Sequence, residues 1–171
     1  LDRVTANRIN RNAVWLTRMV YPIMYAGPYT DTIKLWETHK NDYSYEQYSK
    51  KNYKLADSLE MKIFVDTTTV ISGYASYHKS CDGTKYIKAY PTFIINLSSD
   101  TIQVEYNSSL SLILEAINQN GNWQRIEKSP TYTCGTGLKS GFLPPKEMIL
   151  TRTIIYEGKF KTKLRLRSYK N

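Results

Sequence analysis

With 171 residues, the chain is long enough for one globular domain whose core needs neither a metal nor a disulfide to fold. Hydrophobic residues make up 41% and charged residues 23%, which excludes a wholly disordered protein, and no apolar run reaches the roughly 18 residues of a membrane-spanning helix. The net charge is +9, and six cations stand in the last 13 residues without an acid among them, so the basicity is local.

The first 60 residues are predicted to form an extension that packs on the rest of the chain and contains one helix. Near its start, the pair Gly27-Pro28 indicates a turn. The helix is predicted near 45–59, because Ser44 and Gln47 have the spacing of a capping box and apolar residues then recur at helical spacing.

From residue 61 the hydrophobic period changes to two, which is typical of strands. Strands are predicted over 61–66, 70–77, 86–97, 101–106, 110–117, 123–127, 148–156 and 159–167. Turn sequences separate them, including Asp82-Gly83, Ser98-Ser99-Asp100 and the Asn-Gly pair within 118–122. Short strands about ten residues apart predict an antiparallel sandwich or barrel over 61–171.

The last predicted strand carries most of the local positive charge. Side chains on a strand point to alternate faces, so Phe160, Thr162, Leu164 and Leu166 belong to one side. The other side carries the cations Lys161, Lys163, Arg165 and Arg167. This side is either a solvated face whose lysines protect an edge strand, or a site for an anionic partner. An anionic partner for this side could be lipopolysaccharide or phospholipid head groups, an acidic glycan or an acidic protein. Single-stranded nucleic acid is disfavoured, because Phe160 lies opposite the cations.

The two cysteines, Cys81 and Cys134, have three interpretations. A disulfide between them would close a long loop and stabilise the fold by about 4 kcal/mol in the chain-entropy model. Export would favour that disulfide, whereas a reducing compartment would leave two free thiols. Together with His39 and His78 they have the residue types of a zinc site, but the ligands lack the usual close pairs. A possible disulfide and no metal site are therefore predicted.

Candidate catalytic residues are few. Glu115 stands in an apolar strand and is the best single carboxylate for an enzyme, but the sequence favours a salt-bridged or solvent-facing role over a catalytic one. Cys134 is followed by a glycine-rich loop, but no histidine lies near it in the sequence. Phosphate-binding, dinucleotide and metalloprotease motifs do not occur, so no cofactor is predicted.

Several short segments resemble a known group of proteins. They are Phe93-Ile94-Ile95-Asn96, Glu115-Ala116 with Gly121-Asn122-Trp123, Cys134-Gly135, Leu143-Pro144-Pro145, and Tyr156-Glu157-Gly158 followed by Thr162-Lys163-Leu164-Arg165. Over residues 87–167 or so, this succession resembles uncharacterised exported proteins of Bacteroidetes-type bacteria. The resemblance implies an immunoglobulin-like β-sandwich outside the cytoplasm and brings no established activity with it.

The sequence and this resemblance together predict a mainly β protein, an antiparallel immunoglobulin-like sandwich over 61–171 preceded by the 1–60 extension. We expect a non-enzymatic binding or interaction module of the bacterial envelope, in the periplasm or at the cell surface. Its partner would be a protein or an anionic envelope component. Because the chain begins with Leu1 rather than Met, we expect a product whose export signal has been removed. Two alternatives are an enzyme acting on envelope glycan and a protease-inhibitor-like sandwich presenting a loop within 134–142. The sequence leaves the oligomeric state open.

Overall fold

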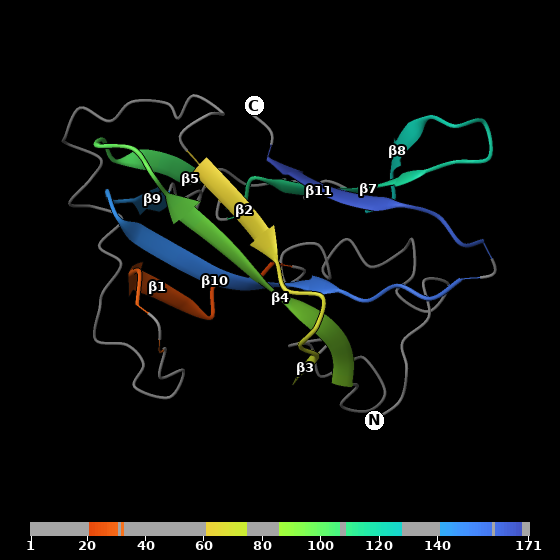
Figure 1. Cartoon of the computed structure of the whole chain (residues 1–171), viewed down its shortest axis with the longest axis horizontal. Helices are drawn as coiled ribbons and strands as arrows, with labels where there is room; N and C mark the ends of the chain where they lie inside the picture. The colour runs from red at the N-terminus through yellow and green to blue at the C-terminus, as the bar shows by residue number, and fades with distance from the viewer. Residues whose placement is uncertain are drawn as a thin grey trace, which may run out of the picture.

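The computed structural model describes residues 21–30, 32, 61–74, 86–106, 109–127, 141–158 and 160–168 (Figure 1). In these ranges the chain forms strands and no helix, and every strand pair is antiparallel. The prediction of a mainly antiparallel β protein is therefore confirmed. Several predicted features lie outside the described residues: the helix near 45–59, the Asp82-Gly83 turn, His39, His78, Cys81 and Cys134.

The strands group into three sheets. In chain order they are β1 (Tyr25–Pro28), β2 (Met61–Val65), β3 (Ile71–Tyr74), β4 (Tyr86–Asn96), β5 (Ile102–Tyr106), β6 (Ser109–Leu110), β7 (Leu112–Ile117), β8 (Trp123–Arg125), β9 (Gly141–Leu143), β10 (Glu147–Ile154) and β11 (Leu164–Ser168). The largest sheet has the order β1-β10-β4-β2, with β3 also paired to β4. The other two have the orders β11-β7-β8 and β6-β5-β9.

The largest sheet is built on the long strands β4 and β10. Its register aligns Ile63, Ile94, Ile149 and Ala26 across four strands, and the first three are branched residues that suit a pleated surface. Ile94 and Ile149 are fully buried, and all four contribute to the hydrophobic core. Period-two alternation along β2 and β4 thus places one face of this sheet on the core.

The two smaller sheets are connected through one residue. Only Ser111 separates β6 from β7, and its N–H donates to the Val104 carbonyl oxygen at 3.0 Å. The strand predicted over 110–117 is therefore divided, because the chain leaves its pairing with β5 and takes β8 and β11 as new partners. Core residues come from all three sheets: Ile94 and Ile149 from the first, Leu143 from the second and Leu112 from the third. One shared core unites the sheets.

A buried amide stabilises the turn between β4 and β5. The Asn96 side chain, 1% exposed, donates to the carbonyl oxygens of Asp100 and Leu143, and its own oxygen accepts from Ser98. Every polar atom of this side chain is thereby satisfied, which offsets the cost of burying it. The turn predicted at 98–100 is confirmed, and Asn96 also links it to β9.

Two predictions at the ends of the chain were wrong. Gly27-Pro28 is not a turn but the end of β1, where Pro28 occupies an edge strand that does not need its missing N–H. The final strand begins at Leu164 rather than at residue 159, because its partner β7 ends at Ile117. The strands β1 and β9 were not predicted. Both are short and depend on pairing with distant parts of the chain.

Candidate anion-binding site

Two predicted cations meet one carboxylate on the β11-β7-β8 sheet. The register places Arg165 of β11 directly opposite Glu115 of β7. Arg165 Nε donates to Glu115 Oε2 at 2.6 Å, and Arg167 Nη2 donates to Glu115 Oε1 at 3.2 Å. The alternation predicted for this strand therefore holds at the two arginines. We call Arg165 and Arg167 the arginine pair.

An aromatic ring completes the arrangement. The Asn-Gly turn, with Gly121 at φ 79°, brings β8 beside β7, and Trp123 pairs with Ile117 there. The Arg165 Cζ atom lies 4.2 Å from the centre of the Trp123 ring, which is cation–π geometry. Arg165 is thus held by a carboxylate and by an aromatic face. Sequence reasoning did not include Trp123 in the site, although the Asn-Gly hairpin signal already paired its strand with that of Glu115.

The arginine pair remains accessible although it is paired. The two side chains are 44% and 49% exposed, whereas that of Glu115 is only 8% exposed. Within the part of the chain that the structure describes, Arg165 Nη1 and Nη2 and Arg167 Nε and Nη1 donate no hydrogen bond. Two guanidinium groups share one carboxylate, so the trio keeps an excess positive charge. These outward N–H groups are suited to a second anion.

The two predicted lysines lie in the segment that leads into β11. The Ile117 N–H donates to the Lys163 carbonyl oxygen at 3.2 Å, which continues the β7–β11 pairing by one residue. Strand alternation then places Lys163 on the same face as the arginine pair. Lys161 is exposed in the loop before it. We use the term basic face for the predicted set Lys161, Lys163, Arg165 and Arg167.

The arginines determine the charge of Glu115. The hydrogen bond from Arg165 lowers the pKa of Glu115, and the hydrogen bond from Arg167 acts in the same direction against desolvation. Glu115 is therefore a carboxylate at neutral pH. A general acid needs a raised pKa, so this environment suits an orienting role for Glu115 better than acid catalysis.

A second carboxyl group has the opposite environment. Glu127 follows β8, and its two oxygens accept hydrogen bonds from Tyr21 Oη at 2.6 Å and from Tyr156 Oη at 2.5 Å. Burial raises the pKa of Glu127 despite these bonds and one from the Leu114 backbone. The pKa of Tyr156 is also raised, by burial and by the adjacent carboxyl group. Because both carboxyl oxygens are occupied, the cluster suits a structural tie between segments. No sequence signal joins these residues.

Other kinds of site find no support in the described ranges. No three His, Cys, Asp or Glu residues gather there in a way that would hold a metal ion. The same ranges contain no helix with the length and apolarity needed to cross a bilayer. No protein-family model, curated protein or solved structure matches the chain.

Proposed function

We propose that this protein is a non-enzymatic binding module that recognises an anionic partner through its basic face. The observation that carries the proposal is the arginine pair, which is oriented by Glu115 and Trp123 while several of its N–H groups point to solvent. Arginines oriented in advance lose little side-chain entropy when they bind. Their planar fork matches the oxygens of phosphate and carboxylate groups.

The partner class follows from the chemistry of this face. Arg165 already occupies one face of the Trp123 ring, so that face does not offer a stacking platform for nucleic-acid bases. An anionic component of the cell envelope needs no such platform. The alternative of a glycan-acting enzyme is weakened by the ion pairs of Glu115, and most of the loop proposed for an inhibitor lies outside the described residues.

Location and finer fold class belong to the same proposal. The segments that resemble exported Bacteroidetes-type proteins include Phe93–Asn96, within β4, and Gly121–Trp123, at the start of β8. This resemblance supports an immunoglobulin-like sandwich that works outside the cytoplasm. Three antiparallel sheets around one core are compatible with it.

The test uses long-chain inorganic polyphosphate as a soluble anion. Arg165→Ala and Arg167→Ala should each weaken its binding about tenfold, because each removes a charge-assisted hydrogen bond. Arg165→Lys, which keeps the charge and loses the fork, should have an intermediate affinity. Lys62→Ala is the matched control, since Lys62 is exposed on β2 in another sheet. Arginine variants that bind as tightly as Lys62→Ala would refute the proposed function.

A further inference from the structure

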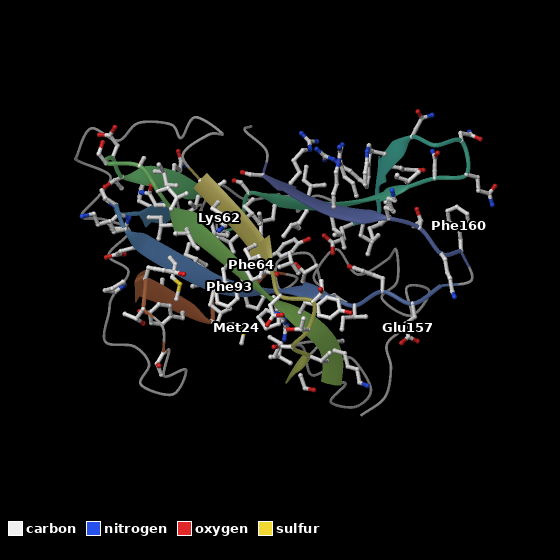
Figure 2. All side chains as sticks on the ribbon, viewed as in Figure 1. Met24, Lys62, Phe64, Phe93, Glu157 and Phe160 are labelled. Carbon is white, nitrogen blue, oxygen red and sulfur yellow. The ribbon has the colours of Figure 1, made fainter. Side chains whose placement is uncertain are left out.

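The loop before β11 and the first residue of β11 expose apolar side chains that a soluble anion would leave uncovered. Phe160 is 53% exposed and Leu164 is 48% exposed, and both exposed lysines of the basic face, Lys161 and Lys163, lie between them. Figure 2 shows Phe160 at one extremity of the molecule, on the connection from β10 to β11. We call Phe160–Leu164 the tip segment. It combines one aromatic, one aliphatic and two cationic side chains within five residues.

Hydrogen bonds fix the tip segment to the sheet. Thr162 Oγ1 donates to the Ile117 carbonyl oxygen at 2.6 Å, and the Ile117 N–H donates to the Lys163 carbonyl oxygen at 3.2 Å. The tip segment is thus attached where β7 ends. Figure 1 shows that the β7–β8 hairpin lies at the same end of the molecule. Phe160 precedes β11, so strand alternation does not place it opposite the cations, and its exposed ring lies at the end of the molecule where the basic face begins (Figure 2).

This combination matches the chemistry of a membrane interface. Apolar and aromatic side chains gain free energy when they enter the boundary between head groups and acyl chains. Lysines and arginines beside them are attracted to anionic head groups, and a lysine stem can lie along apolar surface while its charge stays in the wet layer. A soluble polyanion offers only the second of these interactions. A partner with both an anionic and an apolar layer would cover Phe160 and Leu164 together with the lysines between them.

We propose that the anionic partner is the surface of a lipid bilayer, and that the tip segment enters its head-group region. Phe160 and Leu164 reach the acyl boundary, while Lys161, Lys163 and the arginine pair contact lipid phosphates. This inference rests on the proposed function, because it uses the same basic face, and it names the class of partner that the face binds.

The first test measures co-sedimentation with vesicles. The wild-type protein should bind phosphatidylcholine vesicles that contain phosphatidylglycerol and should not bind pure phosphatidylcholine. Phe160→Ser and Leu164→Ser should each weaken that binding about tenfold, whereas Phe160→Leu should retain most of it. Binding of polyphosphate should be the same for all of them. Phe64→Ser is the matched control, because Phe64 of β2 is 50% exposed in another sheet.

The second test measures directly how deeply the side chain at position 160 enters the bilayer. Phe160→Trp should show fluorescence that is quenched by vesicles with brominated acyl chains, beyond the quenching of the wild-type protein. Phe64→Trp should show no such additional quenching. These two variants retain an aromatic residue at an exposed position, so they preserve the folded state.

The outcomes separate the two proposals. Vesicle binding that survives Phe160→Ser and Leu164→Ser unchanged overturns the membrane inference. Polyphosphate binding without any vesicle binding also overturns it and leaves the proposed function intact. Failure of the proposed function shows itself separately, as arginine variants that bind polyphosphate like Lys62→Ala.

Discussion

Glu115 lies within the β7–β8 hairpin and Glu127 lies just after it, yet the two carboxyl groups differ in their hydrogen-bond partners and in the direction of their pKa shifts. Glu115 of β7 faces two arginines at the solvent boundary, and hydrogen bonds from these cations lower its pKa. Glu127, just after β8, faces two tyrosine hydroxyls, and burial raises its pKa. The comparison shows that a cationic partner favours the charged carboxylate, whereas two neutral donors do not overcome desolvation.

The two environments also imply different roles. Glu115 orients side chains that remain exposed, so its loss should affect binding more than folding. Glu127 links Tyr21, which precedes β1, with Tyr156, which follows β10. Its loss should therefore affect folding first.

Glu127→Ala should have the largest effect. It leaves the hydroxyls of Tyr21 and Tyr156 without their acceptor in a buried setting, and the free energy of unfolding should fall by about 3 kcal/mol. Tyr21→Phe and Tyr156→Phe, which each remove one bond and keep the ring, should each cost about 1 kcal/mol. Urea unfolding at constant pH measures all three. An alanine variant as stable as the wild type would show that the cluster does not hold these segments together.

Glu127→Gln should change the dependence of stability on pH. The folded-state pKa of Glu127 is raised above its ordinary value of 4.5, so its contribution is fully present below pH 4.5 and is lost as the pH rises through the raised pKa. The glutamine variant should lack this loss. Urea unfolding at several pH values above 4.5 makes the comparison. Identical pH profiles for the two proteins would mean that Glu127 is ionised as readily in the fold as in the unfolded chain.

Glu115→Gln should change the dependence of stability on pH in the acidic range, below pH 4.5. The folded-state pKa of Glu115 is lowered, so its contribution is present above pH 4.5 and is lost as the pH falls through the lowered pKa. The variant should therefore be less sensitive to acid below pH 4.5 than the wild type. The effect should be smaller than that of Glu127, because both arginines are half exposed and solvent screens the ion pairs. A larger acid sensitivity in the variant would contradict the ion pairs.

Trp123→Leu should have the smallest effect. It keeps an apolar side chain but removes the ring beneath Arg165, so one of the two contacts that orient this arginine is lost. Affinity for polyphosphate should fall only two- to threefold or so, since Glu115 still holds the guanidinium. Phe64→Leu serves as the control for an exposed ring elsewhere. A loss as large as that of Arg165→Ala would mean that Trp123 itself contacts the anion.

Local patterns predicted the parts of the fold whose signal lies within a few residues. Alternation marked β2 and β5, turn signals on either side marked β4 and β10, and the Asn-Gly pair marked the turn between β7 and β8. The same reasoning took Gly27-Pro28 for a turn, because these residues favour turns wherever no distant strand is considered. In the fold, β10 pairs with that segment from the other end of the chain. The pairing overrides the local preference.

The candidate site likewise has one part that a local pattern predicts and one part that depends on pairing between distant strands. Alternation alone placed Arg165 and Arg167 on one face, since side-chain direction in a strand depends only on the backbone period. Their contact with Glu115, 50 and 52 residues away, depends on register, and so does the position of Trp123. The hydrogen bond between Tyr21 and Glu127 joins residues 106 positions apart, and no local sequence pattern predicts it. Residue spacing alone thus specifies which side chains point together along one strand. Which groups meet depends on the tertiary fold, because contacts across sheets require distant segments to align around the core.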